Sequence, residues 1–369
     1  MALLPNNSSA PAARQPLARL IADGSAISGI LLAEVLSNNY YAADQFRVSI
    51  ALGADPVATL AFWGNAVGVL FDVQFSLDGA GYTSLIQGHA DDLDIDFQQG
   101  VVQIRGRDLS ASLIETRTQE TFSNRTASEI ATILAERHGL TPVVTQTTTP
   151  VGRYYESEHD RVTLGEFSHA TTEWDLLVFL ARQEGFDVFV QGTTLYFQPR
   201  TAPSPPAMVI QPVDVVSMKL ARSLTLARDI EVTVKSWNTR LKNAFTQTVR
   251  GQAVSGIGSA GGGGVQTYVY VRPNLTPDQA LKFAQSRLNE ISRHERVVDI
   301  VMPGELTLTA RSTVLLDGTG SDFDQVYYVD TIERSITFQG GFSQQIRAKN
   351  TSPRTQTTTP ADIVGAVTG

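Results

Sequence analysis

The sequence predicts a mainly β protein in which an α+β segment lies between two β segments. Apolar and polar residues alternate with a period of two at 46–52 and 71–77, which is typical of half-buried strands, and strand patterns return after residue 207. Two capped helical patterns occupy the middle of the chain. Residues 201–206 are rich in proline, as expected of a linker between domains.

Length and composition limit the possible classes of protein. At 369 residues the chain exceeds what one hydrophobic core usually organises, so we expect two or three domains. Without cysteine it has no disulfides or thiolate sites. The net charge of −8 argues against a surface that binds nucleic acid, although DNA could still pass nearby. No stretch predicts a membrane span or a secretory signal.

The first β domain is expected at residues 17–107, after a flexible N-terminal arm at 1–16. Its predicted strands cover 17–22, 28–36, 46–52, 71–77, 84–97 and 101–107, with one or two helical turns between Asp55 and Gly64.

A peripheral α+β domain is expected at residues 108–200. Thr126 and Glu129 form a capping box before one helix, and Thr172 and Asp175 form a similar pair before another. Gly185 stands where a left-handed C-cap is needed, and residues 186–197 predict a hairpin. Trp174 and the neighbouring leucines should anchor the second helix on this hairpin.

After the linker at 201–206, residues 207–350 predict a second β domain with one long helix, which Thr276 caps. Its expected strands cover 213–218, 230–237, 268–271, 297–301, 306–310, 314–316, 327–332 and 343–349. The glycine-rich stretch 254–265 predicts a flexible loop, and residues 351–369 predict a flexible C-terminal tail.

The densest carboxylates do not match a metal motif. In the cluster of Asp91, Asp92, Asp94 and Asp96, a calcium loop would need glycine and glutamate where Phe97 and Gln103 stand. Strand alternation explains the cluster more simply: one set of residues faces water and the other faces the core. The first set is Asp92, Asp94 and Asp96, and the second is Leu93, Ile95 and Phe97.

Other patterns are equally incomplete. Gly256, Gly258 and Gly261 match a dinucleotide motif, but no helix follows them. His294 and Glu295 open a zinc-protease pattern that lacks its second histidine. A surface loop accounts for a polar cluster made of Glu156, Glu158, His159, Asp160 and His169, although paired carboxylates keep a cell-wall hydrolase open as an alternative. Capping and the helix dipole explain Glu173 and Asp175. We therefore assign no catalytic, cofactor-binding or metal residue.

Five stretches carry a family resemblance through their order along the chain. They are SLIQGH at 84–89, IRGRDL at 104–109, TASEI at 126–130 with HGL at 138–140, WDLL at 174–177 through EGF at 184–186, and DQVYYV at 324–329. Together they resemble the baseplate hub, or late control protein D, family of contractile-tailed phages, to which the hub portion of type VI secretion spike proteins is related. Gln325 and Arg334 depart from the pattern, where a small residue and a histidine are usual.

The resemblance implies two tube-type β-barrel domains that flank a small α+β domain, in a homotrimer without a cofactor or an enzymatic activity. The resemblance further implies that the homotrimer forms a ring, which would adapt the hexameric tail tube to the trimeric central spike in the baseplate. The protein would be made in the bacterial cytoplasm and become part of the virion. It would also contact the C-terminus of the tape-measure protein and other baseplate proteins, and DNA would pass through its lumen without specific binding. We expect an acidic lumen to repel DNA. The alternatives are a hub-associated cell-wall hydrolase and a carbohydrate-binding β protein.

Overall fold

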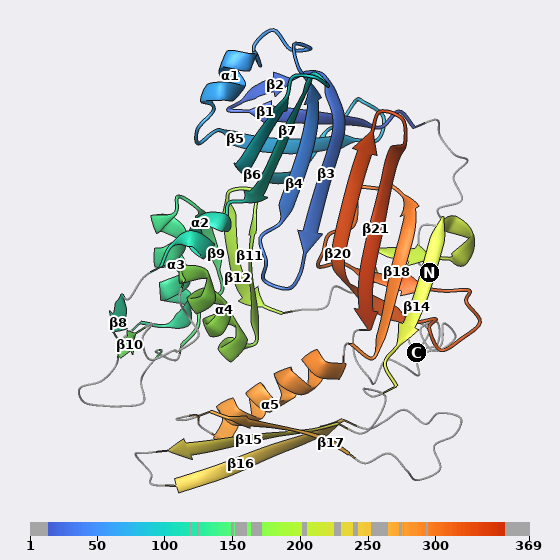
Figure 1. Cartoon of the computed structure of the whole chain (residues 1–369). Coiled ribbons are helices and arrows are strands. Elements are labelled where there is room, and N and C mark those ends of the chain that lie inside the picture. The colour runs from blue at the N-terminus through green and yellow to red at the C-terminus, as the bar shows by residue number, and fades with distance from the viewer. Residues whose placement is uncertain are drawn as a thin grey trace.

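The computed structural model describes residues 14–117, 120–123, 125–148, 151, 161–163, 172–200, 205–224, 230–238, 243–251, 265–272, 275, 277–292 and 294–350. These residues form a mainly β protein, as the sequence predicts (Figure 1). A thirteen-stranded sheet is the largest element of the protein. Four separate clusters of buried apolar side chains form the cores of its different parts.

We call the N-terminal part of this sheet the first β unit. It consists of β1 (Leu17–Ala22), β2 (Ser25–Ile27), β3 (Ile30–Asn38), β4 (Gln45–Ala51), β5 (Leu70–Ser76), β6 (Thr83–Asp96), β7 (Val101–Asp108) and the short helix α1 (Leu60–Asn65). The inward-facing residues of these strands alternate with polar ones and meet in one core, which includes Val48, Phe71 and Ile104.

We call the C-terminal part the second β unit. It consists of β13 (Met208–Ile210), η2 (Pro212–Asp214), β14 (Ser217–Arg222), β18 (Arg296–Pro303), β19 (Thr313–Leu316), β20 (Val326–Thr337) and β21 (Gly341–Asn350). Its core contains Val298, Tyr327 and Ile346.

The two β units repeat one pattern of strand pairing. In the first unit the order is β3–β4–β7–β6–β5–β1, and in the second it is β14–β18–β21–β20–β19–β13. The last pair alone differs, because β1 is antiparallel to β5 whereas β13 is parallel to β19. The chain therefore contains two copies of one strand arrangement.

A β-bulge and its ion pair are repeated as well. The pairing of β6 with β7 shifts between Ala90 and Asp92, and that of β20 with β21 shifts between Val329 and Thr331. The residue at each shift is an aspartate. Arg107 of β7 lies 2.6 Å from Asp91, and Lys349 of β21 lies 2.5 Å from Asp330. Aligned on this feature, the two units match residue by residue along both strands.

The two units join edge to edge. Residues 331–337 of β20 pair antiparallel with residues 32–38 of β3, so one sheet runs through both units (Figure 1). Ile336 belongs to the core of the first unit, and the ring of Phe342 lies edge-on to that of Phe75 at 5.4 Å. We call this contact the internal junction.

Between the two units, residues 111–199 form the middle part. It contains α2 (Ala111–Glu115), β8 (Thr121–Ser123), α3 (Ala127–Arg137), β9 (Thr141–Val144), β10 (Arg161–Thr163), α4 (Glu173–Glu184), β11 (Phe186–Gln191) and β12 (Thr194–Pro199). Both predicted capping boxes are present, before α3 and before α4, and Gly185 ends α4 with a φ of 72°. Helix α4 is buried on several sides, and its core is shared with α3 and the β11–β12 hairpin.

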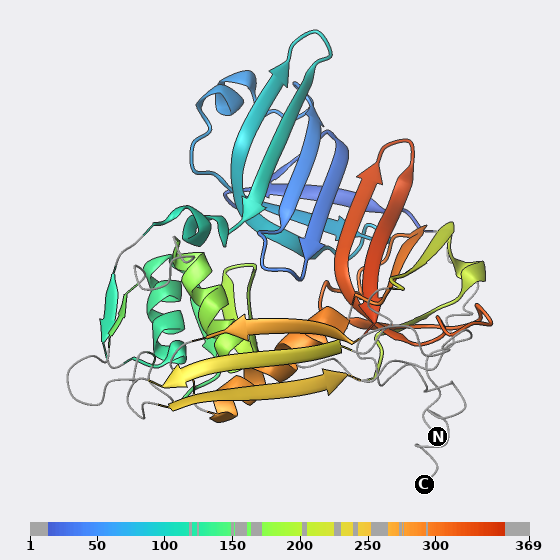
Figure 2. The ribbon, with the colours of Figure 1, turned by 60° about the horizontal axis from the view of Figure 1, so that its bottom comes forward.

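The connection between β14 and β18 carries a further layer. Strands β15 (Ile230–Asn238), β16 (Asn243–Gly251) and β17 (Gln266–Val271) form a separate sheet, and helix α5 (Pro277–Ser292) packs on it (Figure 2). Val232, Val234 and Ala284 lie in the core between them. Residues 207–350 therefore contain two cores. The glycine-rich stretch, apart from Val265, and the cap Thr276 lie outside the described residues.

Three local predictions are wrong. Residues 306–310 form a loop instead of a strand. The strand expected at 213–218 starts only at Ser217, because Pro212 has no N–H for strand pairing and begins the 3-10 helix η2. Phe97 does not face the core and is 65% exposed. Strand β6 ends at Asp96, whose Oδ1 accepts hydrogen bonds from the N–H groups of Gln98 and Gln99, so the alternation stops before Phe97.

Candidate functional site

One face of the shared sheet is polar along both β units. Direct cross-strand neighbours lie on the same face, so the register places Lys219, Asp299 and Arg347 of the second unit on the same face as Glu34 and Arg47 of the first. We call this surface the polar face. Further members are Asp92, Asp94, Arg105 and Glu333.

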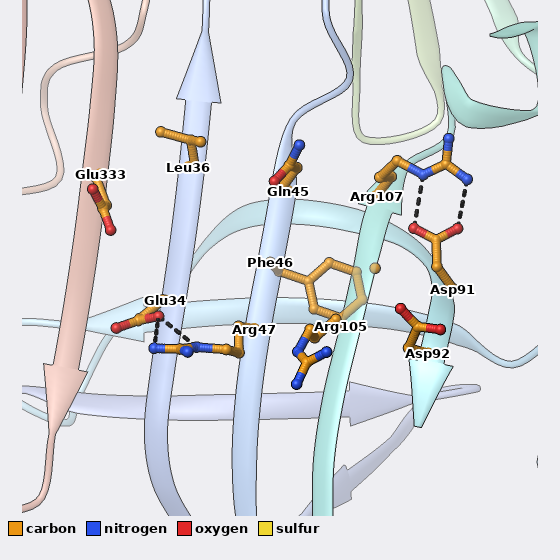
Figure 3. A pocket seen from close by; sticks show the side chains of 11 residues that line it. Glu34, Leu36, Gln45, Phe46, Arg47, Asp91, Asp92, Arg105, Arg107 and Glu333 are labelled. Atoms are coloured by element: carbon orange, nitrogen blue, oxygen red, sulfur yellow. Dashed lines mark hydrogen bonds and ion pairs between the residues drawn. The ribbon is translucent and has the colours of Figure 1, made fainter. Parts of the chain in front are cut away.

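Acidic and basic side chains neutralise one another on this face. Arg47 lies 2.6 Å from Glu34, Arg105 lies 3.1 Å from Asp94, and Arg347 lies 3.7 Å from Asp299. A shallow pocket of about 410 Å³ opens between the paired residues of β3, β4, β6 and β7 (Figure 3). The charge of the face is therefore mixed.

Two glycines let the backbones of β6 and β7 approach closely beside this pocket. A Cβ at Gly88 would lie 1.8 Å from the carbonyl oxygen of Arg107, and one at Gly106 would lie 2.2 Å from that of His89. No side chain fits such distances. The glycines of the SLIQGH and IRGRDL stretches therefore stand where β6 leaves β5 and continues along β7.

The shared sheet ends in two open edges. Among the described strands, β14 pairs with β18 alone, and residues 91–96 of β6 pair with β7 alone. One edge carries Lys219 and Arg222, while the other carries Asp91, Asp92, Asp94 and Asp96. The carboxylates predicted to be solvated are indeed exposed, and they border an unpaired strand edge.

The middle part is attached to the first β unit through the loop 39–44. Trp174 of α4 is 5% exposed, and its indole Nε1 donates a hydrogen bond of 2.8 Å to the carbonyl oxygen of Tyr41. Arg200 donates to the hydroxyl of Tyr41 at 2.9 Å and lies 2.6 Å from Asp187 of β11. Trp174 therefore anchors α4 on the neighbouring unit as well as within its own core.

A half-buried carboxylate, Asp44, and a buried one, Asp108, lie in the same region. Burial and the nearby carboxylate of Asp108 raise the pKa of Asp44 to about 7, and burial also raises the pKa of Asp108. Asp44 accepts a hydrogen bond from the backbone N–H of Asn38 at 2.9 Å. The positive charge of Arg311 favours the ionised form of Asp44 and so lowers its pKa. The guanidinium of Arg311 lies 3.7 Å from the ring centre of Phe189.

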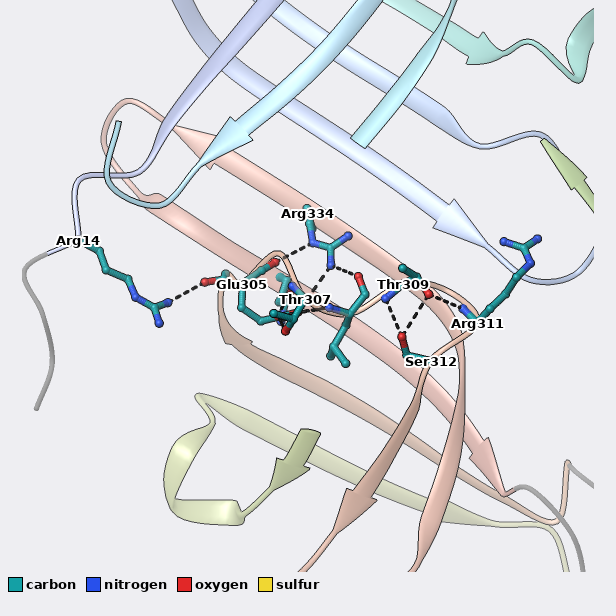
Figure 4. Close-up of polar contacts among 10 residues, drawn as sticks. Arg14, Glu305, Thr307, Thr309, Arg311, Ser312 and Arg334 are labelled. Carbon is teal, nitrogen blue, oxygen red and sulfur yellow. Dashed lines mark hydrogen bonds and ion pairs between the residues drawn. The ribbon is translucent and has the colours of Figure 1, made fainter. Parts of the chain in front are cut away.

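A buried arginine holds the loop 304–312 of the second unit (Figure 4). Arg334 is 4% exposed and donates to the carbonyl oxygens of Glu305 at 3.0 Å and Leu308 at 2.6 Å. The carboxylate of Glu305 accepts the backbone N–H groups of Thr307 at 2.6 Å and Leu308 at 3.2 Å. These contacts occupy the backbone groups that a strand would pair, which is why the predicted strand at 306–310 does not form.

The remaining candidate residues that the structure describes are held by hydrogen bonds and ion pairs within the fold. Glu173 is fully buried and contacts Arg137 and His138, with 2.6 Å between its Oε2 and the Nε2 of His138. Glu295 is also buried and accepts a hydrogen bond from Arg222 at 3.1 Å. Several candidates lie outside the described residues, namely Glu156, Glu158, His159, Asp160, His169, Gly256, Gly258 and Gly261.

Two searches of the described residues gave no hit. No group of three or more histidine, aspartate or glutamate side chains is arranged to hold a metal ion. No helix in that part of the chain has the length and apolarity needed to cross a membrane.

Comparison with known proteins identifies the fold. No family model and no curated protein matches the sequence significantly. Among solved structures, the 43 kDa tail protein of prophage MuSo2 from Shewanella oneidensis superposes with a TM-score of 0.68, at 15% identity over 92% of this chain and 99% of that one. This chain has the fold of a phage tail protein.

Two further structures agree. The tail protein of Neisseria meningitidis gives a TM-score of 0.64 at 15% identity, again over 92% of this chain and 99% of its own. An E. coli component of the type VI secretion system, itself similar to tail proteins of bacteriophage T4, gives 0.55 at 12% identity over 91% of this chain and 77% of its own. The resemblance to baseplate hub proteins that the sequence motifs carry is thus supported at the level of the fold.

Proposed function

We propose that this chain is the structural, non-enzymatic hub of a phage baseplate or of a related contractile injection system. In this proposal three copies form a ring that adapts the hexameric tail tube to the trimeric spike. The observation that carries it is the repeat of the β unit, together with the two open edges that the internal junction leaves at the ends of the shared sheet.

The internal junction supplies the geometry of the contact between copies. It pairs β20 with β3. The repeat makes β6 the counterpart of β20 and β14 the counterpart of β3, and these two are the strands with open edges. Pairing β6 of one copy with β14 of the next would therefore repeat a contact that the chain already makes within itself. Such a head-to-tail contact generates a closed ring when its rotation closes.

The register also predicts a charge pair between copies. In the internal junction Ser335 lies opposite Glu34. Aligned on the bulge, Ser335 corresponds to Asp96, and aligned on the strand pairs, Glu34 corresponds to Lys219. Asp96 of one copy would then face Lys219 of the next. Opposite charges across the interface favour pairing of β6 with β14 over pairing of β6 with β6 or of β14 with β14.

In such a ring each unit would be a tube-type β-barrel, and the polar face would line the channel. The arginines of this face already lie against carboxylates, so they offer few free donors to phosphate groups. DNA would pass without specific binding because the wall is neutralised. The tape-measure C-terminus, the spike and other baseplate proteins would be partners in the virion tail.

The boundaries of the proposed parts follow the sequence. Residues 17–107 and 207–350 would be the barrel domains, 108–200 the peripheral domain and 201–206 the linker. The arm at 1–16 and the tail at 351–369 would be ordered by partners. Within the arm, Arg14 already donates a hydrogen bond of 3.0 Å to the carbonyl oxygen of Gly304, next to the internal junction.

The test is the mass of the assembly at micromolar concentration, with and without the spike protein, measured by mass photometry. We expect a trimer for the wild type, weaker association for Lys219→Glu and for Asp96→Lys, and recovery when the two changes are combined. Lys235→Glu, an exposed position on the separate sheet of β15–β17, is the matched control. A protein that remains monomeric with the spike, and that clears peptidoglycan, would instead support the hydrolase.

A further inference from the structure

Two phenylalanines stand out as the most exposed aromatic side chains of the described residues. Phe97 is 65% exposed and Phe338 is 87% exposed. Each is the first residue of the turn in a long hairpin, Phe97 between β6 and β7 and Phe338 between β20 and β21. These hairpins occupy equivalent places in the two β units.

The turns themselves do not require phenylalanine. In the first turn Asp96 accepts two backbone N–H groups at 2.9 Å, and in the second Thr337 accepts the N–H of Gly340 at 2.7 Å. Gly100 and Gly341 complete the turns with positive φ angles of 64° and 70°. Each turn reads Phe-Gln and then ends in glycine. The backbone of the turn is thus fixed by other residues, which leaves the aromatic side chain without a role in the fold.

Both tips point to the same end of the sheet (Figures 1 and 2). The order β20–β3–β4–β7–β6 is antiparallel at every step, so β6 and β20 run in the same direction and both hairpins turn at one end. Four strand intervals separate the two tips. At about 4.8 Å per interval, this places the tips roughly 19 Å apart along the sheet.

The spacing continues across the contact proposed between copies. Going from β6 to β14 of the next copy and on to its β21–β20 hairpin again takes four strand intervals. A ring built through that contact would therefore carry these phenylalanines at equal lateral intervals around one end. Phe338 would extend two residues farther than Phe97, because the alignment on the bulge matches Phe97 with Ile336. A single partner site would not need two copies of the motif in each chain, whereas a ring of identical subunits offers one pocket at each interval.

We propose that Phe97 and Phe338 are a duplicated docking site for a homo-oligomeric protein ring that presents one apolar pocket per subunit, with polar groups at the pocket rim for Gln98 and Gln339. This inference rests on the ring of the proposed function. A lipid surface fits less well, because neither turn contains a lysine or arginine and Asp96 adjoins the first tip.

The experiment measures binding of the full-length protein to purified tail tube protein, assembled as rings, by biolayer interferometry. Phe97→Ser and Phe338→Ser are compared singly and together with Val67→Ser, which removes another exposed apolar side chain outside both hairpins. We expect each phenylalanine change to weaken binding about tenfold to a hundredfold, the double change to weaken it more, and Val67→Ser to have no effect.

Mass photometry of the same variants separates this inference from the proposed function. All variants should keep the wild-type oligomeric state. If the double variant forms the same assembly and binds the rings with wild-type affinity, the docking inference is wrong and the hub ring stands. If the wild-type assembly does not bind the rings, both the docking site and the role as tube adaptor are wrong. A wild type that never assembles removes the hub ring itself. Phenylalanine-dependent flotation with phosphatidylglycerol vesicles, without ring binding, would also overturn the docking site.

Discussion

The two β units share a strand pattern but differ in what fills it. In β6 the inward-facing positions before the turn hold Leu93 and Ile95, which pack against the core. In β20 the corresponding stretch contains Arg334, which is buried and bound to the loop 304–312. The difference shows that the strand arrangement does not depend on an apolar core at every position. A polar residue can take such a position when a loop supplies carbonyl and carboxylate oxygens as its partners.

Replacing Arg334 with leucine would place an apolar side chain in the second unit where the first unit already has one. We expect Arg334→Leu to lower the free energy of unfolding of this unit by about 3–5 kcal/mol, because the carboxylate of Glu305 stays buried without its cation. The change should appear as faster hydrogen–deuterium exchange in residues 300–345, with the β6–β7 peptides of the same molecule as internal reference.

Arg47→Leu is the matched control, since Arg47 pairs with Glu34 on the polar face with its side chain 44% exposed. An exposed pair of this kind contributes less than about 1 kcal/mol. Equal effects of the two substitutions would show that burial of Arg334 is not what distinguishes the units.

The two units differ again between their first two long strands. The first unit has the loop 39–44 at this place, and the second has the whole layer of β15–β17 and α5. The short loop is the one to which Trp174 attaches the middle part. We expect Trp174→Ala to cost about 3–5 kcal/mol of stability and to raise exchange in both α4 and the loop 39–44.

Trp174→Phe refines this prediction, because it keeps much of the packing and leaves the carbonyl of Tyr41 without its donor. It should cost about 1–3 kcal/mol and affect the loop more than the helix. If exchange in the loop is unchanged in both variants, Trp174 serves its own core alone.

The sequence predicts those features of the fold that depend on neighbours along the chain. Both capping boxes, the αL residue Gly185 and most strands follow from local patterns, and all are present. The repeat of the β units could not be predicted in this way, because it consists of pairings between distant strands and the units share few residues. The strand predicted at 306–310 is a loop. Its apolar residues suit a strand, but the arginine that prevents strand pairing comes from β20, far along the chain.

The same limit applies to the candidate sites. The aspartates of β6 were correctly placed in water, but their position on an open edge depends on which strands pair. Glu173 was attributed to the helix dipole, although it also pairs with Arg137 and His138 across the middle part. The two Phe-Gln turns are visible in the sequence. Only the pairing of the strands shows that they belong to equivalent hairpins of the two β units.

The loop 39–44 also makes the attachment of the first unit sensitive to pH. Asp44 has a folded-state pKa of about 7 against an ordinary value of 3.8, so between these values the folded state holds a proton that the unfolded state has lost. The stability that protonated Asp44 contributes is therefore present at low pH and is lost as the pH rises from about 4 to about 7.

Asp44→Asn keeps a neutral side chain whose oxygen can still accept from Asn38. One pKa unit corresponds to about 1.4 kcal/mol and the two values differ by about three units, so the variant should exceed the wild type in stability by on the order of 4 kcal/mol at pH 8 and match it near pH 4. Thermal unfolding of both proteins across this range measures the difference, and a constant gap at all pH values would show that Asp44 is ionised in the folded protein.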